Sequence, residues 1–326
     1  MILPYYLRLL CLCLSTFYVV HGLVWLGVRG ISVAAVRIAR TMRPRMASRL
    51  LFGLRMAPAA VTAFLVVGFC VPSYLWLEPD TASERVGWFC LLAAATGAAT
   101  GTFSLLRGVI SMVRTERYLR LCGGEPQAAE RSQDSADVVV LQDATAVMAV
   151  AGVVHPKLVV SQTVLDVLSP EQREAAFRHE AAHHASRDNL KKLLLLLSPD
   201  VVPFAGGMHG IERAWARFTE WAADDEAVDG DQDRALSLAS ALVRVAKLGV
   251  RPAPGYVLSS LLQDDRDLEV RVNRLLREPA YAEKPLQPVV ALTRRAALVA
   301  GCIAVTLLLW PQSLGGIHRL LEHLVQ

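Results

Sequence analysis

The sequence predicts a membrane α-helical fold with four spans, joined to an α+β domain outside the bilayer. Three observations lead to this fold class. Of the 326 residues, 53% are hydrophobic and 20% are charged, whereas charged residues make up about a quarter of an ordinary soluble protein. Four separate stretches are apolar enough to span a membrane. One charged stretch, residues 114–288, is long enough to fold as a globular domain.

The four apolar stretches approach or exceed the roughly 20 residues that a spanning helix needs. They comprise residues 9–28, 57–77, 86–106 and 296–310, and the last extends back through 289–292 if Arg294 and Arg295 snorkel. The first stretch lacks the basic start and the small-residue cleavage site of a signal peptide. We therefore expect it to be a retained span.

Charges in the connecting segments predict the orientation. The loop after the first span contains arginines and no acidic residue: Arg37, Arg40, Arg43, Arg45, Arg49 and Arg55. The next loop, residues 78–85, is mainly acidic, and further arginines follow the third span. Because positively charged loops stay inside, residues 107–295 are predicted to be cytoplasmic, in the inner or plasma membrane of a bacterial-type cell. The loop has no pattern of aromatic residues between the arginines, apart from Phe52 between Arg49 and Arg55, which argues against direct nucleic-acid binding. The lipid bilayer is the expected partner.

The chain accordingly divides into four parts. Residues 1–113 are a three-span membrane region with an Arg-rich cytoplasmic loop, 114–288 a cytoplasmic domain, 289–310 the fourth span and 311–326 a short extracytoplasmic tail. In the domain, residues 136–141, 145–154 and 157–161 are short and β-branched, which predicts strands, and helices are expected from there to its end. Residues 190–204 are too short to span; they either lie against the membrane or form a buried core helix.

The residues Ser-Pro-Glu-Gln at 169–172 predict the start of a helix, with a capping box and a proline at the first helical position. This helix contains an HExxH motif, His179-Glu180-Ala-Ala-His183, and too many charges to lie in lipid. Residues i and i+4 share one helical face, so both imidazoles can reach a single metal ion. Glu180 can then take a proton from a water molecule whose pKa the metal lowers.

A catalytic zinc ion needs a third protein ligand and leaves its fourth position to water. Glu220 and Asp224 are also i and i+4 on a predicted helix, so one could bind the metal while the other holds an imidazole. Residue types alone equally allow a solvated acidic face. Further downstream candidates are His209, Glu212, Asp225 and Glu226. His184 lies off the shared face, which favours a solvent-exposed or structural role.

These motifs resemble the membrane zinc metallopeptidases of the BlaR/MecR antirepressor type, which are gluzincins related more distantly to the Ste24/HtpX-like endopeptidases. The resemblance covers about residues 136–280. It rests on Pro-Lys-Leu-Val-Val-Ser at 156–161, the HExxH motif, Arg-Asp-Asn-Leu at 187–190 and the later ExxxD. It implies a gluzincin-type metallopeptidase domain with one Zn²⁺ per chain, held by His179, His183 and Glu220, and Glu180 as general base.

The resemblance also implies supporting roles. Asp224 would orient a ligand, and Asp188 would support the site or the helix end. Arg271, on a predicted late helix, would support the transition state, although a solvated helix face is the more ordinary interpretation. The strand at 145–150 would lie along the cleft and accept substrate as an added strand.

The function implied is an integral membrane zinc endopeptidase that hydrolyses peptide bonds on the cytoplasmic side. Its partner would be a peptide or protein substrate, and a cytoplasmic transcriptional repressor of the BlaI/MecI kind would make it a regulatory protease in signal transduction. Two alternatives stay open. One is a Ste24/HtpX-like quality-control or maturation endopeptidase. The other is a non-catalytic membrane signalling protein with a structural zinc ion, which would normally have four protein ligands.

Overall fold

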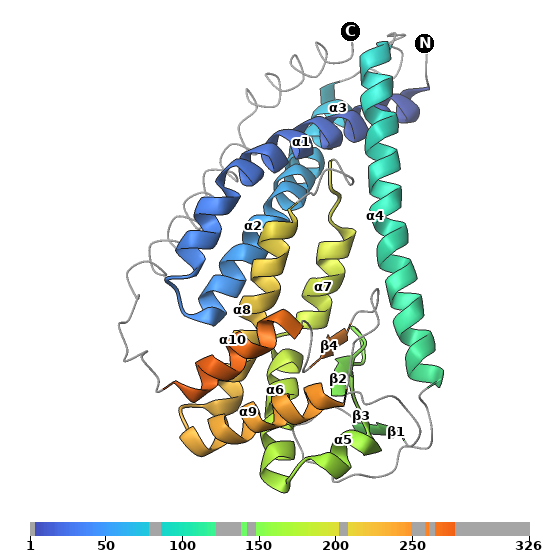
Figure 1. Cartoon of the computed structure of the whole chain (residues 1–326). Helices are drawn as coiled ribbons and strands as arrows, with labels where there is room; N and C mark the ends of the chain where they lie inside the picture. The colour runs from blue at the N-terminus through green and yellow to red at the C-terminus, as the bar shows by residue number, and fades with distance from the viewer. Residues whose placement is uncertain are drawn as a thin grey trace.

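Long helices and a compact domain make up the computed structural model of this chain (Figure 1). The structure describes residues 4–77, 86–121, 138–141, 148–201, 208–248, 258–260 and 265–277. The predicted fourth span at 289–310, the tail at 311–326 and the acidic loop at 78–85 lie outside the described residues. The predictions for these three segments therefore remain predictions.

Three helical segments within the described residues are long and apolar enough to cross a membrane: Tyr5–Ala39, Pro44–Leu77 and Trp88–Arg120. The first is α1 (Tyr5–Ala39). The second comprises α2 (Pro44–Leu65), a π-helical turn η1 (Val66–Cys70) and α3 (Val71–Leu77). The third is α4 (Trp88–Leu121). They include the first three predicted spans and are longer, because each helix continues beyond its apolar core into Arg-containing sequence.

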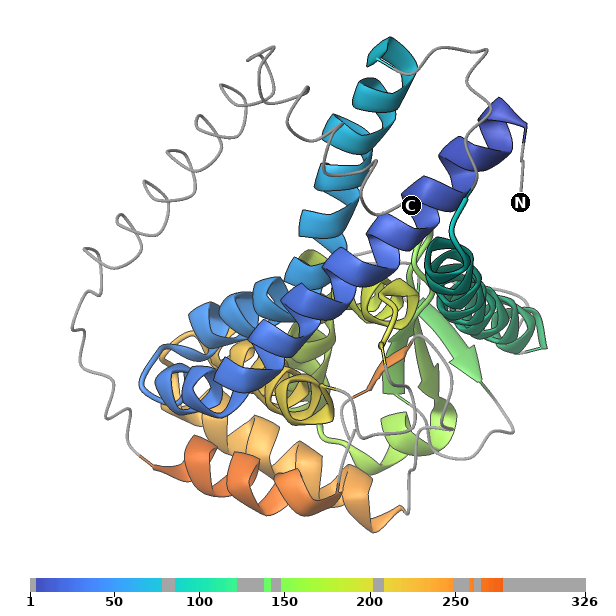
Figure 2. The same cartoon turned by 90° about the horizontal axis from the view of Figure 1, so that it is seen from above.

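Helices α1 and α4 approach closely at one glycine. A Cβ atom added to Gly97 would lie 2.7 Å from the carbonyl oxygen of Leu14 and 3.2 Å from Cβ of Tyr18. Such a contact with backbone would force the helices apart, so the crossing depends on the missing side chain. Seen from above, α1 and α2 lie over α8, and α4 stands on the side of the sheet (Figure 2).

The sheet has four strands in the order β1-β3-β2-β4. They are β1 (Val138–Leu141), β2 (Met148–Ala151), β3 (Lys157–Ser161) and β4 (Leu258–Ser260). Strand β3 pairs in parallel with β1 and antiparallel with β2. The three predicted strands are present, and β2 ends before Gly152, whose φ of 97° starts the turn. Strand β4 contradicts the prediction that only helices follow residue 161. It was not predicted because a strand of three residues is too short to show the two-residue period of a strand.

Strand β2 has a neighbour on each side, which corrects the prediction that it accepts substrate as an added strand. Residues Ala149, Val150 and Ala151 pair antiparallel with β4, and the opposite edge of β2 pairs with β3. An extended peptide can add only to a strand whose backbone groups are unpaired. The prediction failed because β4 comes from a segment about a hundred residues further along the chain.

Six helices complete the domain: α5 (Gln162–Val167), α6 (Pro170–Ala185), α7 (Asp188–Leu197), α8 (His209–Val228), α9 (Gln232–Lys247) and α10 (Asp265–Leu276). Helix α6 begins with the predicted capping box: Ser169 Oγ accepts from the Gln172 N–H at 3.3 Å, and Gln172 Oε1 accepts from the Ser169 N–H at 3.1 Å. Apolar residues of the sheet, α6 and α9 form a shared core, including Met148, Val160, Ala176, Leu238 and Leu242.

Helix α7 joins the domain to the membrane helices. It contains residues 190–197 of the segment 190–204, which was predicted either to lie against the membrane or to form a buried core helix. It packs against α4: a Cβ atom on Gly108 would lie 2.5 Å from Leu197 Cδ2, and Leu193 and Leu195 are buried. Beyond its end, Pro199 O contacts Nε2 of His21 in α1 at 2.9 Å. The helix is therefore a buried element that also touches the membrane helices.

Arg55 was predicted to lie in the Arg-rich loop, and the structure places it inside α2 with its side chain 1% exposed. Its guanidinium donates to Ser198 Oγ at 2.8 Å, Asp200 Oδ1 at 3.2 Å and Glu212 Oε1 at 2.7 Å. A buried charge is tolerated only when it is paired and hydrogen-bonded. Arg55 thus fixes α2 to the end of α7 and the first turn of α8.

Candidate metal centre

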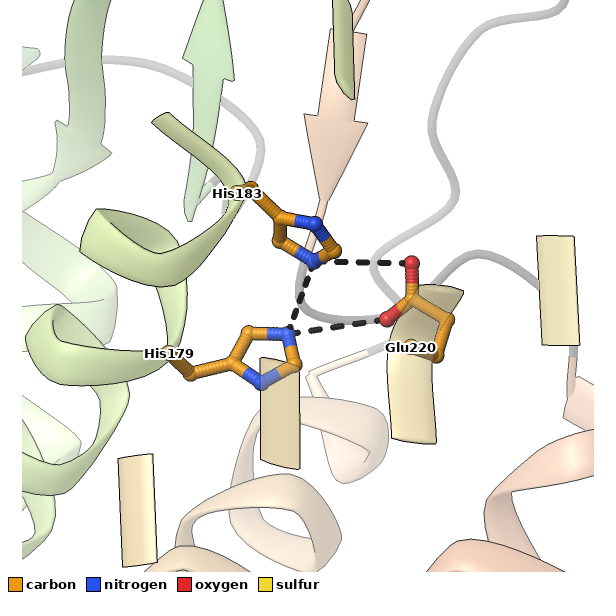
Figure 3. A group of neighbouring side chains, drawn as sticks. All are labelled: His179, His183 and Glu220. Atoms are coloured by element: carbon orange, nitrogen blue, oxygen red, sulfur yellow. Dashed lines mark hydrogen bonds and ion pairs between the residues drawn. The ribbon is translucent and has the colours of Figure 1, made fainter. Parts of the chain in front are cut away.

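Two histidines of α6 and one glutamate of α8 converge on a single point (Figure 3). His179 Nε2 lies 3.1 Å from His183 Nε2. Glu220 lies across from both: Oε2 is 3.5 Å from His179 Nε2, and Oε1 is 3.6 Å from His183 Nε2. All three side chains are buried. The prediction left open whether Glu220 lies on a solvated face, and the structure places it inside, facing both imidazoles.

Two further carboxylates hold the outer nitrogens of the imidazoles. Asp224 Oδ1 is 3.0 Å from His179 Nδ1, and Asp188 Oδ2 is 2.8 Å from His183 Nδ1. A carboxylate only accepts hydrogen bonds, so Nδ1 of His183 carries the proton. His179 Nδ1 contacts Asp224 without hydrogen-bond geometry, and the negative charge beside it favours a proton on the same nitrogen. The lone pair of each Nε2 then faces the common point, an arrangement typical of metal-binding histidines.

The carboxylates also determine the charge of the site. Burial by itself lowers the pKa of His183, but the negative charge of Glu220 and the hydrogen bond to Asp188 outweigh it and raise the pKa to about 10. Burial likewise lowers the pKa of His179, and the contacts with Asp224 and Glu220 outweigh it and raise the pKa. The carboxylates therefore favour a positive charge where the two Nε2 atoms meet, which is either a second proton on an imidazole or a metal cation that takes its place.

The three side chains fit a zinc ion. A tetrahedral zinc ion with bonds of about 2.0–2.1 Å holds its ligand atoms about 3.3–3.4 Å apart. The two Nε2 atoms are 3.1 Å apart, and each lies 3.5 or 3.6 Å from a different oxygen of Glu220, so the separations are close to that value. Two imidazoles and a carboxylate are a common zinc donor set that leaves one position open. Within the described residues the group of metal-binding side chains has three members, His179, His183 and Glu220.

Glu180 follows the first histidine and is fully buried. Its Oε2 accepts a hydrogen bond from the backbone N–H of Val150 in β2 at 3.1 Å. Its Oε1 is buried and has no hydrogen-bond partner among the described residues. Burial raises the pKa of Glu180 to about 7, and the charges of His183 and His179 oppose that rise only in part. A carboxyl group with a pKa near neutrality can both accept and donate a proton.

Arg271 of α10 is buried, so the interpretation as a solvated helix face is wrong. Its guanidinium donates to Asp224 at 2.9 Å and 2.6 Å, and its Nη1 lies 3.1 Å from Glu220 Oε2. Burial raises the pKa of Asp224, but the Arg271 charge and the contact with His179 outweigh it and lower that pKa to about 2. The pKa of Glu220 is held well below its usual value despite burial, by His183 first and then by Arg271.

Asn189 was not among the predicted site residues, and it links β2 to the centre. The Asn189 side-chain amide donates to the carbonyl oxygens of Val150 and Gly152 at 2.8 Å and 2.9 Å. It holds β2 in the position from which the Val150 N–H reaches Glu180. In the sequence, only its place in the Arg-Asp-Asn-Leu motif pointed to Asn189. A contact with a strand 39 positions away leaves no pattern in the neighbouring residues.

The other downstream candidates lie apart from the centre. Glu212 pairs with Arg55, Asp225 with Arg274, and Glu226 with Arg45. His209 is exposed at the start of α8, and His184 is half-buried on α6. Within the described residues, none of them belongs to the group of side chains that could hold a metal ion.

Replacing Asp188 by asparagine is expected to weaken zinc binding about 10- to 100-fold, the usual effect of losing a partner that orients a ligand. The amide keeps the shape but loses the negative charge that holds the Nδ1 proton of His183. Competition with a chelating dye measures the zinc dissociation constant. Asp166→Asn, at an exposed position on α5, is the control. Equal zinc affinity in Asp188→Asn and the unmodified protein would show that Asp188 does not support the centre.

The comparison with protein families gives one match. The family model of peptidase family M48 matches residues 116–278, half of the chain. The matched range contains every side chain of the metal centre, from Val150 in β2 to Arg271 in α10. None of the curated proteins matches the chain.

Proposed function

The chain belongs to peptidase family M48, and from this premise we propose that it is an endopeptidase whose zinc ion is held by His179, His183 and Glu220. Membership in the family makes the protein a membrane zinc metallopeptidase. The observation that supports these ligands most strongly is the convergence of three buried donor atoms next to Glu180. A structural zinc site would normally be closed by a fourth protein ligand and would have no use for Glu180.

The proposed mechanism assigns each side chain one task. Zinc, when bound, would polarise the scissile carbonyl group and make a water molecule more acidic. Glu180 takes a proton from the attacking water through Oε1 and later gives it to the leaving amine. The Val150 N–H holds the other carboxylate oxygen at 3.1 Å, so the carboxyl group keeps its orientation while the proton moves.

Asp188, Asp224 and Arg271 act as positioning residues in this proposal. The two aspartates keep each Nδ1 protonated, which leaves both Nε2 atoms available to the metal. Arg271 holds Asp224 and Glu220 together and compensates their charge. We place its contribution in this support, because its guanidinium contacts both carboxylates and lies 3.5 Å from Nε2 of His179.

We further propose that the domain faces the cytoplasm. Arg114, Arg117 and Arg120 lie near the end of α4 from which the chain continues into the domain. Arg40 and Arg43 lie in the connection between α1 and α2, and Arg45 lies in the first turn of α2. Positively charged segments next to spanning helices stay inside. The substrate would then be a cytoplasmic peptide or protein, and by the resemblance described above a transcriptional repressor is the first candidate.

A maturation or quality-control role for membrane proteins is the second candidate, and the position of the centre favours it. Helix α8, which carries Glu220, packs along α2, and Thr219 Oγ1 lies 2.8 Å from Ser48 Oγ. The helix that carries Glu220 therefore packs against a helix that is long and apolar enough to cross a membrane. Such a position suits a substrate that arrives from the membrane.

The experiment uses the full chain, purified in detergent, loaded with zinc and mixed with an unfolded fluorescent protein such as labelled casein. We expect cleavage that 1,10-phenanthroline abolishes and added zinc restores. Absence of cleavage by zinc-loaded protein towards unfolded, folded soluble and membrane-embedded substrates would contradict the proposal. Preference for the soluble or for the membrane-embedded substrate would choose between the two candidate roles.

A further inference from the structure

A pocket lies between the end of α1 and one face of α8. Its volume is about 440 Å³. Its lining includes Val36, Arg40, Arg213, Arg217, Phe218 and Trp221. Three of these side chains are arginines, and the part of the lining that the structure describes contains no aspartate or glutamate. It is not part of the metal centre, although Trp221 directly follows Glu220 on α8.

The pocket offers positive charge and hydrogen-bond donors without matching acceptors. Arg217 pairs with Asp267 at 2.8 Å, whereas neither Arg40 nor Arg213 forms an ion pair with a carboxylate among the described residues. The indole nitrogen of Trp221 is buried and has no hydrogen-bond acceptor within the same part of the chain. Because this nitrogen has almost no accessible surface, it does not face the pocket, and the excess positive charge of the lining comes from Arg40 and Arg213. The chemistry of the lining therefore favours an anion.

The surroundings of the pocket are apolar. Val36 and Phe218 form part of its wall. Ile31, Val33 and Ile38 of α1 are exposed, and Val33 shares a helical face with the lining residues Val36 and Arg40. Helix α1 is long and apolar enough to cross a membrane. Exposed aliphatic residues on such a helix are expected to contact acyl chains. The pocket thus combines a cationic rim with a direct path to the lipid phase.

We propose that this pocket binds the phosphate group of an anionic phospholipid, with the acyl chains lying along α1. Basic pockets at the cytoplasmic side of membrane helices bind such head groups. The predicted fourth span is a poorer occupant, because its cytoplasmic end carries Arg294 and Arg295, which would add positive charge to a pocket that already has an excess. A lipid in this position would bridge α1 to the helix that carries Glu220.

The test measures lipid binding itself, so it does not depend on peptidase activity. The full chain in a neutral detergent is titrated with phosphatidylglycerol, and native mass spectrometry counts the lipids that remain bound. The variant Arg40→Gln/Arg213→Gln removes two unpaired cations from the pocket. The control, Arg114→Gln/Arg117→Gln, removes the same charge from exposed positions on α4. We expect the pocket variant to bind phosphatidylglycerol about 10- to 30-fold more weakly and the control to change less than about threefold.

Phosphatidylcholine with the same acyl chains is the comparison lipid. Equal retention of phosphatidylcholine, or an equal loss of binding in the two double variants, would overturn the proposal, because either result means general attraction rather than a built site. A photo-crosslinking residue at position 214, which also lines the pocket, identifies the occupant directly. A lipid adduct supports the proposal, and a crosslink to residues 289–310 overturns it.

Discussion

Replacement of Glu180 by glutamine is expected to reduce peptide cleavage by about 10²- to 10⁴-fold, the usual contribution of a general acid–base group. Glutamine has nearly the same shape and still accepts the hydrogen bond from the Val150 N–H, but it cannot take a proton from water. The three metal-binding side chains are untouched. Zinc content and the thermal unfolding midpoint should therefore stay the same, which separates lost chemistry from lost structure.

The measurement compares initial cleavage rates of zinc-loaded protein at equal zinc occupancy. Glu174→Gln is the matched control, because Glu174 lies on the same helix, is exposed and pairs only with Arg178 on the surface. Its activity should remain within about twofold of the unmodified protein, in keeping with the small energy of exposed ion pairs. Cleavage by Glu180→Gln at more than a tenth of the normal rate would remove Glu180 from the proposed mechanism.

Replacement of Arg271 by methionine is expected to lower the free energy of unfolding by about 3–5 kcal/mol, because it leaves buried charges without their partner. Arg271 contacts both Asp224 and Glu220, and all three side chains are almost completely buried. Methionine fills much of the volume but compensates neither carboxylate. The loss should be smaller with zinc bound, since the ion supplies positive charge to the same group of carboxylates.

Chemical denaturation in mixed micelles measures the change for Arg271→Met with and without zinc. Arg274→Gln is the control: it lies one turn further along α10 and pairs with the exposed residue Asp225. This variant should cost less than about 1 kcal/mol. If Arg271→Met is no less stable than Arg274→Gln, the buried ion pairs do not hold the centre together.

Local sequence predicted the parts of the site that one helix determines. The capping box at Ser169 and the HExxH motif both belong to α6, and the 3.6-residue period of a helix fixes the relative positions of His179 and His183. Glu220 was a candidate among several, because its role depends on how α8 packs against α6. The i and i+4 spacing of Glu220 and Asp224 indicated that both carboxylates share one face of the helix. A solvent-exposed acidic face has the same spacing, so the pattern did not identify the ligand.

Long-range contacts account for the features that the sequence did not predict. Arg271 lies 47 positions from Asp224, and Arg55 lies 157 positions from Glu212. Both arginines look like surface residues in sequence, because burial of a charge depends on partners that only the tertiary fold supplies. Strand β4 likewise depends on a long-range contact. It forms by pairing with the edge of β2, and its three residues show no strand period of their own.

The central claim is the zinc centre of His179, His183 and Glu220, and zinc content per chain tests it most directly. Protein purified in detergent without chelators is analysed beside Glu220→Ala and the control Glu226→Ala, which changes an exposed glutamate of the same helix. The account predicts about one zinc ion per chain in the unmodified protein and in the control. In Glu220→Ala the zinc affinity should fall by more than the 10- to 100-fold expected for loss of a supporting residue. Unchanged zinc affinity in Glu220→Ala would contradict it.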